Sequence, residues 1–101
     1  MEYLVRLTDR ALRDMEAIYE FIEADASEAA FAWFSDLTEA VSSLEQYPER
    51  GAVILEGKKF RHLFFGKRQD TYRIIYAVDK RKAVVNVFHI RHGARAPLSN
   101  E

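Results

Sequence analysis

Cationic side chains gather in the last third of the sequence, where they could bind phosphate or an acidic partner. Arg73 lies inside one apolar segment, TYRIIYAV, and Arg91, His92 and Arg95 follow the end of a second, AVVNVFHI. Guanidinium groups bind phosphates and carboxylates through paired hydrogen bonds, and a histidine beside them could act as a general base or donate a hydrogen bond. We expect the two segments to form a β-hairpin that carries these candidate site residues to one end of a sheet.

Arg73 interrupts an otherwise apolar strand, and burying an unpaired guanidinium there would be costly. It could bond to a carboxylate on a helix, belong to a site, or be exposed, and the sequence leaves these alternatives open. Whether Arg61 or His62 joins Arg73 on one face depends on the preceding turn, because a one-residue slip exchanges the two. His89 alternates with apolar strand residues, so we interpret it as a packed histidine.

Several kinds of chemistry lack their signatures in this chain. There is no cysteine, which excludes disulfides and thiolate metal sites, and the three histidines do not have the spacing of a metal site. The sequence also contains no phosphate-binding glycine loop, dinucleotide-binding pattern or nucleophile elbow. We therefore expect no metal and no cofactor.

The net charge of −1 conceals two oppositely charged halves. Residues 1–57 carry four basic and thirteen acidic side chains (net −9), whereas residues 58–95 carry eleven basic and two acidic ones (net +9). If the halves occupy different sides of the fold, the surface is polarised, and an anionic partner should bind the second half.

The first half of the chain predicts a strand and two helices. Alternation over Tyr3–Leu7 indicates a short strand, and apolar residues at helical spacing predict a helix over residues 10–24 that Thr8 or Asp9 can cap. Ser27 can cap a second helix that ends before Pro48. The stretch from there to Lys59 has no clear period and holds an irregular loop or a short extended segment.

The second half predicts three strands joined by hairpins: Phe60–Phe65, Thr71–Val78 and Ala83–Ile90. A four-residue loop at residues 79–82 would place Val78 opposite Ala83 and Tyr72 opposite His89. The predicted fold is α+β in the order β-α-α-β-β-β. It is a twisted, mostly antiparallel sheet with two antiparallel helices on one face and the first strand at an edge.

The chain is long enough for one domain, residues 1–101, with a single core. Its start does not have the pattern of a signal peptide, and no apolar run approaches membrane-spanning length. We therefore expect a soluble cytoplasmic protein without a membrane partner.

Taken together, these segments resemble the RelE/ParE superfamily of toxins from bacterial type II toxin–antitoxin modules, some of which are called plasmid stabilisation proteins. The resemblance spans nearly the whole chain. It rests on the two-helix first half and on the order of four further pieces: Tyr47–Gly51 (YPERG), Phe60–Leu63 (FRHL), Tyr72–Val78 (YRIIYAV) and His89–Arg95 (HIRHGAR).

The resemblance implies a small toxin that a cognate antitoxin neutralises, with toxin–antitoxin hetero-oligomers as the expected assembly. RelE-like members cleave mRNA on the ribosome. On that branch Arg73 matches an arginine that steadies phosphate, and His92 would have to replace the tail tyrosine that this sequence lacks. ParE-like members instead bind and inhibit DNA gyrase.

A pI of about 6.3 is unfavourable for a protein that must bind ribosomal RNA, and a protein target tolerates a polarised surface better. We therefore favour a ParE-like gyrase inhibitor that is not an enzyme, with Arg61, Arg73, Arg91, His92 and Arg95 as target-binding residues. The alternatives are a RelE-like mRNA endonuclease, with Arg73 and His92 as catalytic residues, and an inactive antitoxin-binding module.

Overall fold

A computed structural model describes residues 2–54, 59–67 and 70–93 of the 101-residue chain. The elements in chain order are β1 (Leu4–Leu7), α1 (Asp9–Phe21), α2 (Glu28–Ser42), two 3₁₀ turns (Ser43–Glu45 and Pro48–Arg50), β2 (Ala52–Val53), β3 (Phe60–Phe65), β4 (Tyr72–Asp79) and β5 (Val84–His92). Within these ranges no helix has the length and apolar character needed to cross a membrane.

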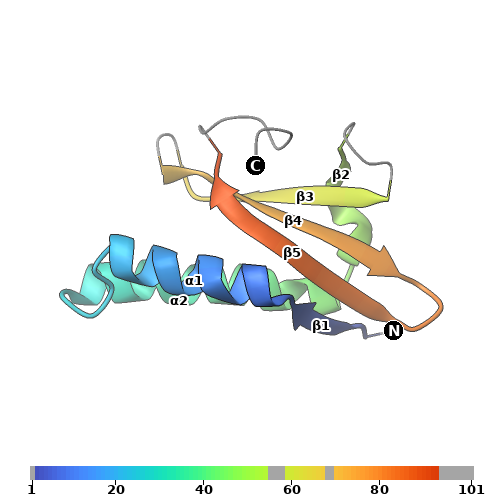
Figure 1. The fold of residues 1–101 in the computed structure, drawn as a ribbon, viewed down its shortest axis with the longest axis horizontal. Helices are drawn as coiled ribbons and strands as arrows, with labels where there is room; N and C mark the ends of the chain where they lie inside the picture. Colours follow the sequence, from blue (N-terminus) through green and yellow to red (C-terminus); the bar gives the residue numbers. More distant parts are fainter. Residues whose placement is uncertain (1, 55–58, 68–69, 94–101) are drawn as a thin grey trace.

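Each helix begins directly after a residue whose side chain caps it, Thr8 for α1 and Ser27 for α2. The Thr8 hydroxyl accepts a hydrogen bond from the Ala11 amide and the Ser27 hydroxyl accepts one from the Ala30 amide, each at 3.1 Å. These bonds satisfy amides that the first helical turn leaves without partners. Ser27 is thus confirmed as a cap, and of the two candidates Thr8 and Asp9 the cap is Thr8. α1 and α2 run in opposite directions (Figure 1), and Tyr19 of α1 meets Phe34 of α2 with ring centroids 5.0 Å apart.

The sheet has the strand order β1-β5-β4-β3-β2. β1 pairs in parallel with β5 at one edge, and the other three pairings are antiparallel. This confirms the predicted α+β fold, the three hairpin-connected strands and the first strand at an edge. The two-residue strand β2 occupies part of the stretch that had no clear period.

The two helices pack on one face of the sheet, and the core lies between the layers (Figure 1). The Trp33 ring of α2 contacts both Phe65 of β3 and Tyr72 of β4, with centroid distances of 5.3 and 5.5 Å. The buried core cluster is Ala11, Ile18, Leu37, Val41, Leu44, Tyr72, Ile74, Tyr76, Val85, Val87 and Ile90. Burial of these apolar side chains is the main force that holds helices and sheet together.

The loop between β4 and β5 lies one residue further along the chain than predicted. The Asp79 side chain accepts a hydrogen bond from the Lys82 amide at 3.1 Å, and Ala83 takes a left-handed backbone (φ 55°) as the last loop residue. Val78 therefore pairs with Val85 rather than with Ala83. This shift of two residues corrects the register but keeps each side chain near the loop on its predicted face.

A β-bulge in β5 changes the register again. Tyr76 pairs with Val87, whereas the preceding Ile75 pairs with His89, so Phe88 is the extra residue. A bulge of this kind places two successive side chains on the same side and reverses the alternation beyond it. The register predicted for the open end of the hairpin, with His89 opposite Tyr72, is therefore wrong. The sequence of β5 is mostly apolar and β-forming, so it does not indicate where the extra residue lies.

The turn after α2 rests on Tyr76, whose side chain is fully buried. Its hydroxyl donates to the Pro48 carbonyl at 2.6 Å and accepts from the Gly51 amide at 3.0 Å. Burial raises the pKa of Tyr76, since the phenolate would lose its hydration. A side chain at Gly51 would collide with this hydroxyl, because a Cβ there would come within 2.4 Å of it.

Candidate functional site

The face of the sheet opposite the buried core carries two of the candidate residues, Arg73 and Arg91, and we call it the outer face. The strand register assigns its side chains by their pairing partners. They include Phe60, His62 and Phe64 of β3, Arg73 and Ile75 of β4, and Phe88, His89 and Arg91 of β5. His89 and Arg91 lie at the edge of this face, where α1 passes β5.

Arg73 and His62 form the centre of the outer face. The Arg73 guanidinium reaches His62 Nδ1 from both Nε (3.2 Å) and an Nη nitrogen (3.0 Å). The structure thus answers two open questions: Arg73 bonds to a histidine rather than to a helix carboxylate, and His62 shares its face. Arg91 is the cross-strand partner of Arg73 and is only 7% exposed. Two arginines and a histidine therefore occupy adjacent positions of the sheet here.

Arg61 lies on the other side of the sheet. It pairs with Tyr76, and its guanidinium donates to the carbonyls of Glu49 (3.0 Å) and Gly51 (2.7 Å). These bonds tie β3 to the turn after α2, which is a structural task. The structure therefore does not bring Arg61 together with Arg73.

His92 also faces away from Arg73. It pairs with Tyr72 on the helix side, where the two rings meet edge to face with centroids 5.2 Å apart. The reversal at the bulge is the reason, because it turns His89 and Arg91 outward and His92 inward. Arg95 lies outside the described residues. Among the predicted residues, the structure brings together Arg73 and Arg91.

His89 is a packed histidine, as expected, and is 8% exposed. Its Nδ1 lies 2.6 Å from Asp14 Oδ2 of α1, and its Nε2 lies 3.2 Å from an Arg10 nitrogen. Asp14 Oδ2 also accepts the Ile90 amide at 2.9 Å, beyond the point where β1 ends. Asp14 therefore accepts a backbone hydrogen bond at the edge of β5, as the carbonyl of a neighbouring strand would. This bond holds α1 against β5.

Aromatic side chains of the outer face were not among the predicted site residues. Phe60 and Phe88 meet edge to face at 5.3 Å, and Phe64 lies against the His62 ring at 4.8 Å and is 55% exposed. Ile75 joins Phe60 and Phe88 in lining an apolar hollow of about 400 Å³. The alternation in FRHLFF is the sequence signal that could have found Phe60 and Phe64.

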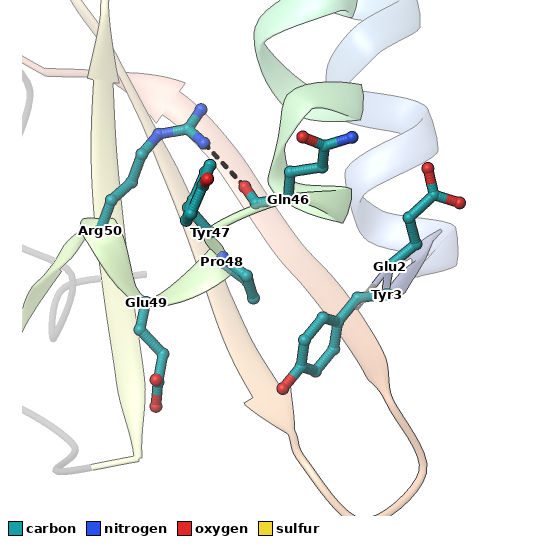
Figure 2. A pocket seen from close by; sticks show the side chains of 7 residues that line it. All are labelled: Glu2, Tyr3, Gln46, Tyr47, Pro48, Glu49 and Arg50. Atoms are coloured by element: carbon teal, nitrogen blue, oxygen red, sulfur yellow. Dashed lines mark hydrogen bonds between the residues drawn. The ribbon is translucent and has the colours of Figure 1, made fainter.

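A separate cleft of about 650 Å³ lies between the start of the chain and the turn after α2. Figure 2 shows Tyr3 and Tyr47 beside it, with Arg50 bonded to the Gln46 carbonyl (3.1 Å). Tyr47 is 80% exposed and has a left-handed backbone (φ 53°). None of the predicted site residues that the structure describes lines this cleft.

The described residues contain no cluster of three histidine, aspartate or glutamate side chains that could hold a metal ion. The outer face instead combines cationic groups with aromatic rings, of which Phe64 is exposed. Such a surface can bind an anion or an acidic protein segment, and stacked bases could lie on its rings.

A family model described as the ParE toxin of the type II toxin–antitoxin system parDE matches residues 5–97. Because the match covers most of the chain, this protein belongs to that toxin family. No protein of curated function matches the sequence significantly.

Solved structures of the wider RelE/ParE group share the fold. The chromosomal ParDE system from P. aeruginosa has a TM-score of 0.70 at 22% identity, covering 90% of this chain and 96% of the other. The RelBE2 toxin–antitoxin complex from Mycobacterium tuberculosis has a TM-score of 0.66 at 21% identity, covering 94% and 95%. The intact E. coli RelBE complex has 0.63 at 21%, covering 92% and 99%.

Proposed function

We propose that this toxin is a ParE-like inhibitor of DNA gyrase that a cognate antitoxin neutralises in a hetero-oligomeric complex. The observation that carries the proposal is the separation of Arg73 from His92 by the sheet, in a chain whose family match is to ParE. RNA cleavage by this pair would need both groups on the same phosphodiester. A toxin that acts by binding a protein has no such requirement.

An antitoxin partner is supported by the solved structures that share this fold. The M. tuberculosis and E. coli structures are described as toxin–antitoxin complexes, and the P. aeruginosa structure as a ParDE toxin–antitoxin system. A role in plasmid stabilisation and a cytoplasmic site of action are parts of the same proposal, since both the gyrase and its DNA would be reached there.

A RelE-like mRNA endonuclease is the second candidate, and one observation favours it. Arg73, Arg91 and His62 are neighbours on the outer face, next to the exposed ring of Phe64. Guanidinium groups could hold a phosphate while the ring stacks on a base. In that case His62, rather than His92, would be the general base.

The deciding experiment is a paired assay on one preparation of the full chain, purified from co-expression with its antitoxin and then separated. Gyrase supercoiling and mRNA cleavage in a translating extract are measured side by side. We expect loss of supercoiling and intact mRNA. Cut mRNA with normal supercoiling would overturn the gyrase proposal.

Three variants separate the two mechanisms. Arg73→Gln should weaken gyrase inhibition by roughly tenfold, since one charged contact of the outer face is lost. His62→Ala should leave appreciable gyrase inhibition but would abolish mRNA cleavage if the second candidate is right. Arg13→Gln, an exposed change on α1, is the matched control and should behave as the wild type in both assays.

A further inference from the structure

A cavity of about 410 Å³ lies where α1 passes the end of β5. One part of its lining is cationic, with Arg10 of α1 and Arg91 of β5, and His89 and His92 of β5 also line it. Its volume is near the lower end of the range for small-ligand sites, which suits one or two side chains.

Asp14, the one carboxylate among the described lining residues, is already engaged. Asp14 Oδ2 takes hydrogen bonds from His89 Nδ1 (2.6 Å) and the Ile90 amide (2.9 Å). With the Nδ1 proton directed at Asp14, His89 Nε2 accepts from Arg10 at 3.2 Å. The Asp14 charge therefore holds the imidazole in place, and the guanidinium groups give the cavity its positive character.

The rest of the lining is apolar. Ile18 and Ala17 of α1 form part of the wall, and Phe21 at the end of the helix is 73% exposed. A large aromatic side chain exposed at the rim of a cationic hollow suits a ligand that has both an apolar body and an anionic group.

We propose that this cavity binds a peptide segment of a protein partner in which an acidic residue follows an apolar one, with the carboxylate at Arg10 and Arg91 and the apolar side chain against Ile18 and Phe21. The antitoxin is the source of such a segment, and the inference rests on the proposed function for that source alone.

The charge around the cavity favours a peptide over a nucleic acid. α1 and the loop that follows it carry several acidic side chains: Asp9, Glu16, Glu20, Glu23 and Asp25. The phosphates of a nucleic acid would be repelled by these acidic side chains along the whole length of the nucleotide chain. A single carboxylate on an apolar segment contacts only the cationic lining.

The test is an NMR titration of the isotopically labelled full chain without antitoxin or gyrase. The probes are N-acetyl-Leu-Asp-amide, its matched N-acetyl-Leu-Asn-amide, inorganic phosphate and a short oligouridylate. We expect the acidic dipeptide to shift the Ile90 and Arg91 amides and the His89 and His92 imidazoles, and to bind roughly tenfold more tightly than the asparagine dipeptide.

Variants test the two halves of the cavity separately. Arg10→Gln should weaken binding of the acidic dipeptide about tenfold, and Ala17→Phe should block it by filling the apolar part. Arg13→Gln, a neighbouring arginine outside the lining, should have no effect.

Equal binding of the two dipeptides, or no shifts at all, would overturn the proposal. Binding of phosphate or oligouridylate in preference to the acidic dipeptide would also overturn it, in favour of a nucleic acid ligand. Because gyrase is absent from this titration, a failure of the gyrase proposal leaves its result unchanged.

Discussion

At the scale of single residues, Tyr76 joins the two halves of the molecule. Its buried hydroxyl holds the Pro48 carbonyl and the Gly51 amide, so one phenol of β4 fixes the turn through which the chain leaves the helices. The YPERG segment is therefore best understood as a structural motif. Its glycine leaves space for the hydroxyl, and its proline supplies the acceptor.

We predict that Tyr76→Phe lowers the free energy of unfolding by about 1–3 kcal/mol, because the Pro48 carbonyl and Gly51 amide lose a buried partner. Urea denaturation measures the change. Tyr47→Phe removes a hydroxyl from an exposed ring and should change stability by less than about 0.5 kcal/mol. Equal losses in the two variants would contradict this account of the turn.

The same tyrosine predicts a pH dependence. Burial raises the pKa of Tyr76 above its ordinary value of 10.0, so the folded state binds this proton more tightly than the unfolded chain. Its contribution is complete below about pH 10 and is lost as the pH rises through the raised value. The stability difference between wild type and Tyr76→Phe should therefore shrink above that pH in denaturation curves. A constant difference would refute it.

At the scale of elements, α1 is tied to the sheet by the side chains at its start. The Thr8 amide donates to the Val87 carbonyl at 3.0 Å, and its hydroxyl donates to the Phe88 carbonyl at 3.2 Å while capping α1. Thr8 and Asp14 thus form hydrogen bonds with the backbone of Phe88 and Ile90, on the part of the β5 edge that β1 does not reach.

We predict that Thr8→Ala costs more than Ser27→Ala. Loss of a helix cap costs about 1 kcal/mol at either position, but only Thr8 also serves a carbonyl at the bulge. Thermal or chemical unfolding measures both, and Thr8→Ser, which keeps the hydroxyl, is the control. Equal costs for the two alanine variants would show that the bond to Phe88 contributes nothing.

Local patterns predicted the elements well, because caps and alternation act over a few residues. Thr8 and Ser27 capped the helices as expected, and the three hairpin strands were found. Long-range register was harder to predict. A loop shifted by one residue and the extra Phe88 depend on how β4 meets β5 in space, and the sequence of either strand alone does not specify that.

The candidate site was predicted only in part, because its geometry also depends on long-range register. Arg73 and Arg91 do lie together, but only because the bulge turns Arg91 outward, since the expected register would have put it on the opposite face. His92 was expected to follow the end of the strand, whereas it is the last residue of β5 and faces the helices. Arg10 and Asp14 come from α1, more than seventy residues away from His89, and no short pattern links them.

At the scale of the whole molecule, charge follows the layers of the fold. The helices come from the half with a net charge of −9, and β3, β4 and β5 come from the half with +9. A polarised domain is oriented by the field of its partner before contact, so charge affects mainly the rate of association.

We predict that the association rate with gyrase falls at least about tenfold between roughly 0.05 and 0.5 M salt, because screening weakens this orientation. Surface plasmon resonance with immobilised gyrase measures the rate. Arg73→Gln should reduce the salt dependence, and Arg13→Gln, on the acidic layer, should not. A rate that is insensitive to salt would argue against electrostatic orientation.

The bulge at Phe88 also suggests how such a toxin could change during evolution. Deletion of that single codon would restore the alternation of β5 and exchange the two surfaces presented by its last residues, with His92 turned outward and Arg91 inward. No point mutation achieves this exchange. An insertion or deletion of one residue in this strand would thus be a short path between toxins that share a fold and differ in their targets.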